Sequence, residues 1–241
     1  MLDCQFLLSA ISAMSPLTIF FTLLCYLAVA IFTAGVTYKL YRYIRTPQVL
    51  RIPLTPAPKT YSGVASRLFC EVFFFSSLFK ASRWAWVFGW VFHAAFLVLL
   101  LRHAHYFFTS PSAWMFQIQA YSSTVALLML AGVAGLWARR LLVDRIRYIT
   151  APSDHLMLAL ITGIGLSGIA LKATAPQIML AAKNFVRGLM YIDWYPFPPS
   201  WLFGIHIFLV ASLLIIFPFS KLMHAPGVVF NPVFNQRDRA R

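Results

Sequence analysis

Four of the six histidines in this sequence lie within or beside strongly apolar stretches, where a polar ring is unusual. His93 and His103 lie in one stretch, and His206 and His224 lie in or directly after another. A titratable ring in hydrocarbon is costly unless its nitrogens have partners. Neutral imidazole is a good axial ligand for haem iron, and a porphyrin would also shield the ring from lipid. The four residues are therefore candidate ligands of two haems b.

The spacing of these histidines suits that chemistry if the two stretches are antiparallel helices. His93 then lies level with His224 at one end, and His103 lies level with His206 at the other. At about 100° per residue, the side chains of His206 and His224 point the same way from their helix. Those of His93 and His103 differ in direction by about 80°. The axial rise is about 15 Å from His93 to His103 and about 27 Å from His206 to His224, so the two spacings do not match. Helix tilt and a bend at Pro218 must absorb the difference.

The neighbouring polar residues give weaker predictions. His105 and His155 are expected mainly to be hydrogen-bonded packing residues near the membrane boundary, with His105 also a competitor of His103 as a ligand. Arg102 is costly inside a helix unless it is paired. Its expected partner is a haem propionate, with snorkelling of its guanidinium to the interface as the alternative. Lys221 and Arg83 are candidates for the propionates at the other end.

Composition places the chain in a membrane. It is 61% hydrophobic and 11% charged, whereas about a quarter of the residues of a soluble domain are charged. The net charge of +14 does not indicate nucleic-acid binding, because the Lys and Arg residues lie in the connections between apolar stretches. The three cysteines lack the spacing of a zinc or iron–sulfur site.

Five stretches are long and apolar enough to span a bilayer. The first is expected to be a retained helix rather than a signal peptide, because the first sixteen residues contain no Lys or Arg. We therefore predict a single all-α membrane domain over residues 1–241. Its five transmembrane helices lie at about 17–38, 86–108, 117–138, 154–174 and 201–220.

The distribution of positive charge predicts the orientation. Sixteen Lys and Arg residues lie on one side of the predicted membrane, in the connection 39–85, the turn 139–147 and the tail 221–241, and three lie in the connection 172–200 on the other. By the positive-inside rule, the N-terminus is periplasmic and the C-terminus is cytoplasmic. Within the connection 39–85, four prolines predict an extended segment over 45–59, and an amphipathic segment at about 64–84 is expected to lie along the interface.

These features together resemble the gamma subunit of respiratory nitrate reductase. The shared features are five helices, an outside N-terminus, and histidine gaps of ten residues in the second helix and eighteen in the fifth. The resemblance implies a dihaem bundle of four or five helices that exchanges electrons with menaquinone or ubiquinone. It pairs His93 with His224 at a cytoplasmic haem and His103 with His206 at an outer haem.

Two segments also resemble the DsrM subfamily, the membrane cytochromes of the sulfite reductase-associated DsrMKJOP complexes. The segment PFSKLMHAPGVVFNPVFNQ, residues 218–236, is similar to the ending of that subfamily, and SLFKASRWAWVFGWVFHAAF, residues 77–96, is similar to its first histidine region. The sequence differs at Ala225-Pro226-Gly227, where a glycine pair is usual.

The subfamily resemblance implies an electron-transfer subunit rather than a stand-alone enzyme, in a bacterial or archaeal cytoplasmic membrane. Its implied partners are a cytoplasmic DsrK-like iron–sulfur subunit, which acts on the sulfur carrier DsrC, and further membrane and periplasmic subunits. A nitrate reductase gamma subunit and a heterodisulfide reductase membrane subunit remain alternatives. The direction of electron flow stays open.

A cofactor-free membrane anchor or transporter is the alternative of another class. A transporter is expected to show pseudo-symmetric halves and helices broken near the bilayer centre, and five helices cannot divide evenly. An anchor would leave four membrane histidines unexplained. The matched histidine pairs therefore favour a cytochrome.

Overall fold

The computed structural model describes residues 15–46, 56–108, 110 and 112–238. Within these ranges the regular elements are all helices, and no strand is present. Five helical segments are long and apolar enough to cross a membrane, which confirms the predicted number of spanning helices. They are Pro16–Arg45, Arg83–Tyr106, Ala113–Leu142, Pro152–Thr174 and Trp201–Phe219.

The five spans turn most of their apolar surface outward. Only 17% to 28% of the most hydrophobic window of each span is buried inside the protein. Large aliphatic side chains such as Leu27, Leu97 and Leu127 are more than half exposed, at 54%, 55% and 59%. Exposed leucines over whole helices suit contact with lipid rather than water.

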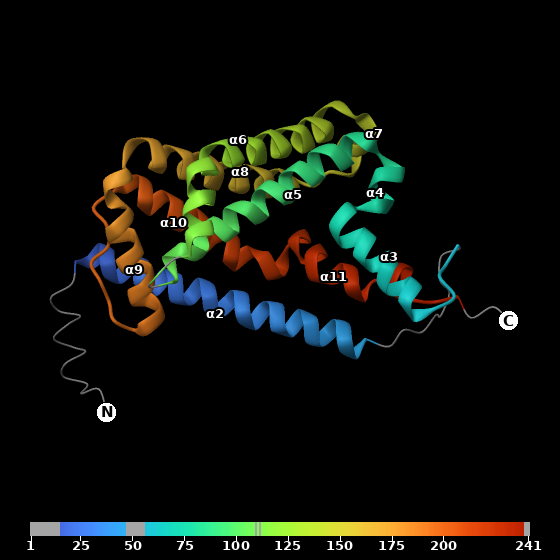
Figure 1. Cartoon of the computed structure of the whole chain (residues 1–241), viewed down its shortest axis with the longest axis horizontal. Coiled ribbons are helices and arrows are strands. Elements are labelled where there is room, and N and C mark those ends of the chain that lie inside the picture. The colour runs from blue at the N-terminus through green and yellow to red at the C-terminus, as the bar shows by residue number, and fades with distance from the viewer. Residues whose placement is uncertain (1–14, 47–55, 109, 111, 239–241) are drawn as a thin grey trace.

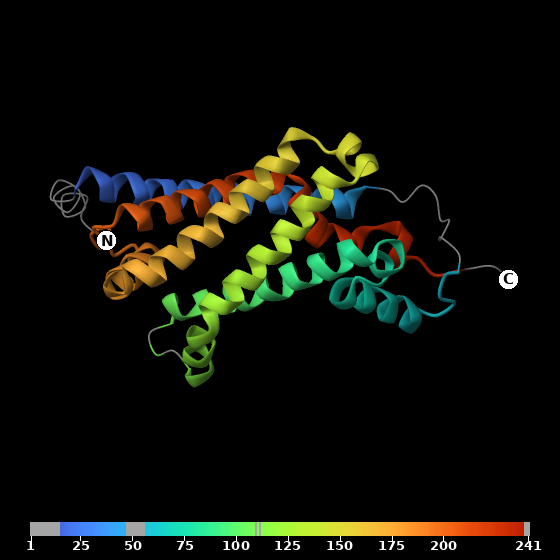
Figure 2. The same ribbon diagram turned by 90° about the horizontal axis from the view of Figure 1, so that it is seen from above.

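The spans form a bundle in which α5 and α6 are the closest pair (Figures 1 and 2). Helix α5 runs Arg83–His103 and α6 runs Ala113–Leu142. Gly132 allows their close approach, because a Cβ there would lie 2.8 Å from the backbone nitrogen of Phe92. Helix α8, Pro152–Thr174, packs against α6, and α10, Trp201–Ile216, packs against both α8 and α2, Pro16–Arg45.

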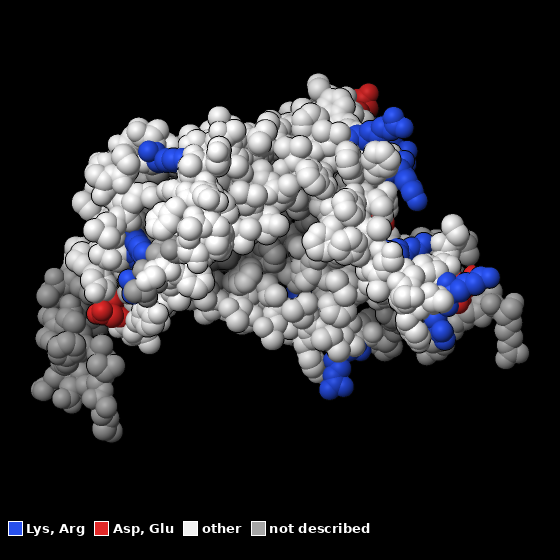
Figure 3. Space-filling view, in the orientation of Figure 1, with Lys and Arg blue, Asp and Glu red and all other residues white. Residues whose placement is uncertain are grey.

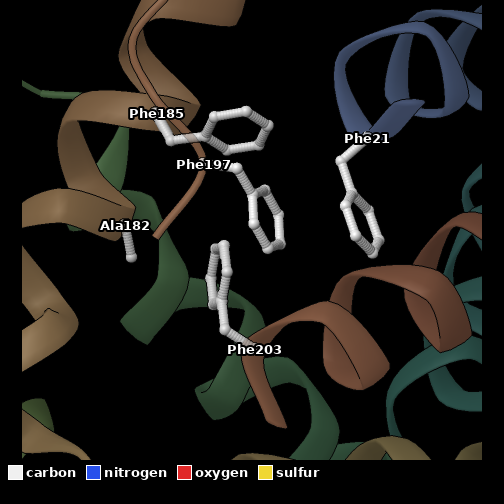
Figure 4. Packing of buried hydrophobic residues seen from close by; sticks show 5 residues of the cluster. All are labelled: Phe21, Ala182, Phe185, Phe197 and Phe203. Carbon is white, nitrogen blue, oxygen red and sulfur yellow. The ribbon is translucent and has the colours of Figure 1, made fainter. Parts of the chain in front are cut away.

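At the His103 end of the bundle, the connection between α8 and α10 is folded rather than open. It contains the turn η2, Pro176–Ile178, and the amphipathic helix α9, Met179–Tyr191. The prediction did not include α9, which is too short to span a membrane. Its buried face packs against α2 and α10 in a cluster of aromatic rings (Figure 4). The cluster consists of Phe21, Ala182, Phe185, Phe197 and Phe203, and the rings of Phe21 and Phe197 stack with centres 4.2 Å apart.

At the His93 end, the predicted interfacial segment is a pair of short helices. Helix α3 runs Tyr61–Phe74 and α4 runs Ser76–Ala81, joined by Phe75 in a left-handed conformation with φ 48° and ψ 48°. The Glu71 carboxylate accepts hydrogen bonds from the side chains of Ser76 and Ser77 and from the Ser77 N–H. These bonds hold the turn and satisfy the first turn of α4.

The fifth span is interrupted near Pro218. Helix α10 ends at Ile216, and two 3₁₀ turns follow, η3 at Phe217–Phe219 and η4 at Lys221–Met223. The chain then continues in α11, His224–Phe230, and α12, Pro232–Asn235. The predicted bend at Pro218 is confirmed. The angle between His206 and His224 was calculated along one straight helix, and that calculation is wrong. Proline lacks the N–H that continues the helix, so His224 begins a new element.

The observed helix ends extend beyond several of the predicted ones. Helix α2 continues to Arg45 rather than residue 38, and α6 continues to Leu142 rather than 138. Basic residues in the last turns favour this extension, because they interact with the C-terminal end of the helix dipole. The second helix begins at Arg83 rather than residue 86 and ends before residue 108, with the 3₁₀ turn η1, Ala104–Tyr106, after His103. Most of the predicted extended segment 45–59, with Arg51, lies outside the described residues, as do Arg239 and Arg241.

Candidate functional site

The structure brings His93 and His224 together at one end of the bundle. His93 lies on α5 and His224 is the first residue of α11. Their ring centres are 6.0 Å apart and their ring planes are perpendicular, at 90°. The rings of Phe75 and Phe92 contact His93 edge-on, with centres 5.1 Å and 4.9 Å away. This pair is therefore bordered by apolar rings.

His103 and His206 form a second pair toward the other end. His103 lies on the last turn of α5, and His206 lies on the second turn of α10. Their ring centres are 6.3 Å apart, and their planes are nearly parallel, at 11°. Gly168 of α8 lies beside this pair, because a Cβ there would be 3.4 Å from Cε1 of His206. A Cβ at this position would therefore be in van der Waals contact with the imidazole.

The separations in both pairs fit one metal ion between two imidazoles. A histidine nitrogen binds a transition metal at about 2 Å and lies about 1 Å from the centre of its own ring. Two rings on opposite sides of one ion therefore have centres about 6 Å apart. The observed values are 6.0 Å and 6.3 Å. A direct hydrogen bond between the two rings would need a shorter separation.

Each of the four rings also has its Nδ1 atom engaged, which leaves Nε2 available. The Nδ1 atoms of His93, His103 and His224 lie 2.7, 2.6 and 2.9 Å from the carbonyl oxygens of Gly89, Leu99 and Lys221. Nδ1 of His206 lies 2.9 Å from the Ser167 hydroxyl, which itself donates to the Ile164 carbonyl. A hydrogen bond of this kind from Nδ1 fixes the tautomer of a metal-binding histidine.

The donor set suits haem better than a bare metal ion. In the described part of the chain, no group of three or more His, Cys, Asp or Glu residues is placed to hold a metal. Protein sites for zinc supply at least three side-chain ligands. Two imidazoles alone, as in each pair here, would be enough to hold a haem, because the porphyrin would supply the other ligands of its iron. An open cavity of about 620 Å³, lined partly by His224 and Tyr43, lies beside His224 of the first pair.

Arg102 lies next to the second pair and is tied to α6. Its Nε donates to Oε1 of Gln119 over 2.8 Å. Lys172 of α8 reaches the same place, since its Nζ lies 3.0 Å from the Gln119 carbonyl and 2.8 Å from the Ser122 hydroxyl. Two cations thus meet on one face of α6 beside His103 and His206. Neither forms an ion pair with a carboxylate among the described residues, so the place suits an anionic group.

The other two histidines are placed differently. His105 lies in η1, with Nδ1 2.6 Å from the Arg102 carbonyl and its ring against Tyr106. No second histidine ring of the described chain faces it, so His103 rather than His105 forms the pair with His206. His155 accepts a 2.9 Å hydrogen bond from the Trp137 indole, as expected of a packing residue.

The cations predicted for the first pair have other partners. Lys221 forms an ion pair with Asp154, with Nζ 2.8 Å from Oδ1, and the Arg83 guanidinium lies 5.9 Å from the centre of the Phe79 ring. Sequence reasoning also missed Ser167, Gln119 and Asp154. The scarcity of acidic residues could have singled out Asp154, which is one of only six in the chain.

Positive charge gathers at the His93 end of the molecule. In Figure 3 most of the visible Lys and Arg side chains lie at the end formed by α3, α4 and α7, Asp144–Ile149. The residues on these elements and on the neighbouring ends of α2 and α6 are Lys39, Arg42, Arg45, Arg67, Lys80, Arg139, Arg140, Arg145 and Arg147. This is the side that the sequence predicts to be cytoplasmic.

Comparisons with known proteins agree on one family. Residues 75–238 match the family described as the nitrate reductase gamma subunit. This range contains both histidine pairs and four of the five spans. It begins at Phe75, so α2 and the whole of α3 lie outside it.

Two curated relatives match nearly the whole chain. The Hdr-like menaquinol oxidoreductase cytochrome b-like subunit of Archaeoglobus fulgidus is 31% identical, over 90% of this chain and 79% of that protein. The protein of the same name from Archaeoglobus profundus is 29% identical, over 92% of this chain and 80% of that protein. At this coverage the similarity includes at least part of α2, which the family match does not reach.

Proposed function

The chain belongs to the nitrate reductase gamma subunit family, and we propose that it is a dihaem cytochrome b that carries electrons across the membrane. In this proposal His93 and His224 hold one haem b, and His103 and His206 hold the other. The observation that carries the proposal is the geometry of the two pairs. Both ring separations, 6.0 Å and 6.3 Å, suit a single iron between two imidazoles.

The residues around each pair have specific tasks in this function. The carbonyls of Gly89, Leu99 and Lys221 and the hydroxyl of Ser167 orient the four imidazoles and keep Nε2 directed at the metal. The haem supplies one-electron chemistry when it is bound. Because His93 and His103 are ten residues apart on α5, the two sites lie at different depths, about 15 Å apart along the helix.

Arg102 is proposed to bind a propionate of the haem held by His103 and His206. Its guanidinium is already oriented by Gln119, and Lys172 adds a second positive charge. A propionate would neutralise cations that are otherwise costly within a membrane span. A fixed positive charge also favours the reduced state of a nearby haem.

A quinone is the proposed exchange partner at the His103 end. The relatives named above are menaquinol oxidoreductase subunits, which favours menaquinone over ubiquinone. In the proposed orientation this end faces the periplasm, and the more basic His93 end faces the cytoplasm, in the cytoplasmic membrane of a bacterium or archaeon. Electrons would enter or leave the protein at opposite faces of the bilayer.

A cytoplasmic iron–sulfur subunit is the proposed partner at the His93 end. The relatives are named as Hdr-like, which supports a partner related to heterodisulfide reductase. The tail segment 218–236 further supports a DsrK-like partner that acts on a sulfur carrier. Basic side chains on α3, α4 and α7 would contact that partner, or else anionic lipid headgroups.

The proposed function is tested by two measurements on the purified full chain. A pyridine haemochrome assay is expected to give two haems b per polypeptide. A reduced menaquinol analogue is then expected to reduce them, as seen in the visible spectrum. A chain that binds no haem in gently prepared membranes would contradict the cytochrome and favour a cofactor-free anchor.

A further inference from the structure

The segment that carries His224 has no helix continuity with the helix that carries His206. Helix α10 ends at Ile216, and η3 and η4 separate it from α11. The side chain of His224 is also exposed to the surroundings of the bundle. Its position therefore depends on contacts made by the turn before it.

One of these contacts is an ion pair with a buried carboxylate on another span. Asp154, in the first turn of α8, is only 6% exposed. Both of its oxygens lie 2.8 Å from Nζ of Lys221, in the turn η4. Arg140 of α6 lies 3.5 Å from Oδ2, and the N–H of Ala151 donates to the same oxygen over 3.1 Å. The carboxylate thus joins α6, α8 and η4 at one point.

The same lysine orients the ring of His224. The carbonyl oxygen of Lys221 lies 2.9 Å from Nδ1 of His224, so the backbone that the ion pair fixes also accepts the hydrogen bond from the ring. An Nδ1 hydrogen bond sets the tautomer and direction of a metal-binding imidazole. Displacement of Lys221 would therefore move or free the ring.

We propose that the Asp154–Lys221 ion pair is a positioning element for His224, which holds this ligand opposite His93. Asp154 acts through Lys221 and does not itself touch the haem. The inference rests on the proposed role of His224 as a haem ligand. It gives a task to a buried carboxylate that the electron-transfer function does not otherwise use.

The charges around Asp154 support a positioning role for this residue rather than simple capping of α8. The N–H of Ala151 would need only a neutral acceptor, which an asparagine could supply. A buried carboxylate is costly unless cations compensate it, and here a lysine reaches it although its own side chain is 71% exposed. The ion pair with that lysine ties the turn beside His224 to α8.

The test uses the full chain, purified with its haem, in the variants Asp154→Asn and Lys221→Met. Asparagine keeps the acceptor for Ala151 and removes the charge. Each variant is expected to lose most of the haem at the His93 end, or to change its low-spin electron paramagnetic resonance signal and its midpoint potential. The haem at the His103 end is expected to stay unchanged and serves as an internal report of correct folding. Lys221→Arg is expected to restore the wild-type signal.

The matched control is Asp144→Asn. Asp144 forms a 2.7 Å ion pair with Arg147 at the same end of the molecule, but its side chain is 87% exposed. This variant is expected to leave both haems unchanged. The double variant Asp154→Asn with Lys221→Met is expected to lose no more of the haem at the His93 end than either single variant does. The reason is that both substitutions remove the same interaction.

Two results would overturn the inference. One is an unchanged spectrum and potential of the His93-end haem in both single variants. The other is an equal loss of both haems, which would indicate a general packing role. The proposed function fails separately: if His224→Ala keeps two haems, His224 is not a ligand. If His224→Ala loses one haem while Asp154→Asn and Lys221→Met lose none and shift nothing, only the positioning role is wrong.

Discussion

The imidazole planes of His103 and His206 are nearly parallel, at 11°, with ring centres 6.3 Å apart. The planes of His93 and His224 are instead perpendicular, at 90°. The difference follows from the supporting elements. His206 is held by the Ser167 hydroxyl on a regular helix, whereas His224 is held by the carbonyl of Lys221, the first residue of a 3₁₀ turn. The two proposed haems are therefore expected to be spectroscopically distinct.

Electron paramagnetic resonance of the oxidised protein tests this difference. Perpendicular imidazoles leave two iron d orbitals nearly equal in energy, and parallel imidazoles split them. We expect a strongly anisotropic low-spin signal from the His93–His224 site and a more rhombic one from the His103–His206 site. His224→Ala should remove the first signal and His206→Ala the second. A single signal shared by both sites would show that the ring orientations are not as described.

Removal of the charge of Arg102 is expected to lower a midpoint potential. A positive charge beside a haem stabilises the reduced iron, so Arg102→Gln should make the haem at the His103 end harder to reduce. We expect a shift of up to about 60 mV, which is tenfold in a one-electron equilibrium. Redox titration of the visible spectrum measures it. Arg102→Lys should retain most of the potential, and Arg139→Gln, at the opposite end, should leave it unchanged.

Gly35 is expected to tolerate no side chain. A Cβ at this position of α2 would lie 2.6 Å from two ring carbons of Pro218, and a proline ring cannot rotate away. Overpacking of this kind costs about 1–3 kcal/mol. Gly35→Ala should therefore destabilise the chain despite the better helix propensity of alanine, which contributes about 1 kcal/mol.

Gly163→Ala is the matched control for Gly35. Its Cβ would meet Cδ1 of Leu209 at 3.2 Å, and that flexible side chain can move. Thermal unfolding of the purified variants in detergent compares the two. Equal stability of Gly35→Ala and the wild type would show that α2 does not pack this closely on Pro218.

The Glu71 carboxylate is expected to make the α3–α4 turn sensitive to acid. Partial burial alone would raise the pKa of Glu71. The hydrogen bonds from Ser76 and Ser77 and the charge of Arg67 outweigh burial and hold the pKa below its usual value. Because the pKa is lower in the folded state, the stabilisation is complete above the unfolded value of about 4.3. It is lost as the pH falls through the folded value.

Unfolding measured between neutral pH and about pH 3 tests this dependence. Glu71→Gln should lower the stability at neutral pH and flatten its fall on acidification. An identical pH dependence of the wild type and the variant would contradict the role of the carboxylate. Asp144→Asn again provides an exposed control.

Much of this fold is predictable from the sequence, because a lipid bilayer requires apolar helices of spanning length. Five apolar stretches of spanning length predict five helices, since every backbone group within a bilayer must bond internally. The amphipathic helix α9 was missed because its length and its apolar face do not satisfy that pattern. Part of its partner surface, the ring of Phe21, comes from a distant helix of the chain.

The histidine pairs were predictable from order along antiparallel helices, but their surroundings were not. His224 lies after a break that Pro218 signals, and the sequence does not reveal where the chain resumes. Ser167 and Gln119 are ordinary polar residues in apolar helices, and only tertiary packing directs them toward His206 and Arg102. The partner of Lys221 likewise depends on the placement of α8 beside the fifth span.

The central claim is that two separate histidine pairs each hold one haem. The most direct measurement is the haem b content of the purified chain and of the variants His93→Ala, His224→Ala, His103→Ala and His206→Ala, by pyridine haemochrome assay. We expect two haems per chain in the wild type and one in each variant. The two variants of a pair should lose the same haem in the reduced-minus-oxidised spectrum. Retention of two haems in any of these variants, or loss of different haems within a pair, would contradict the account.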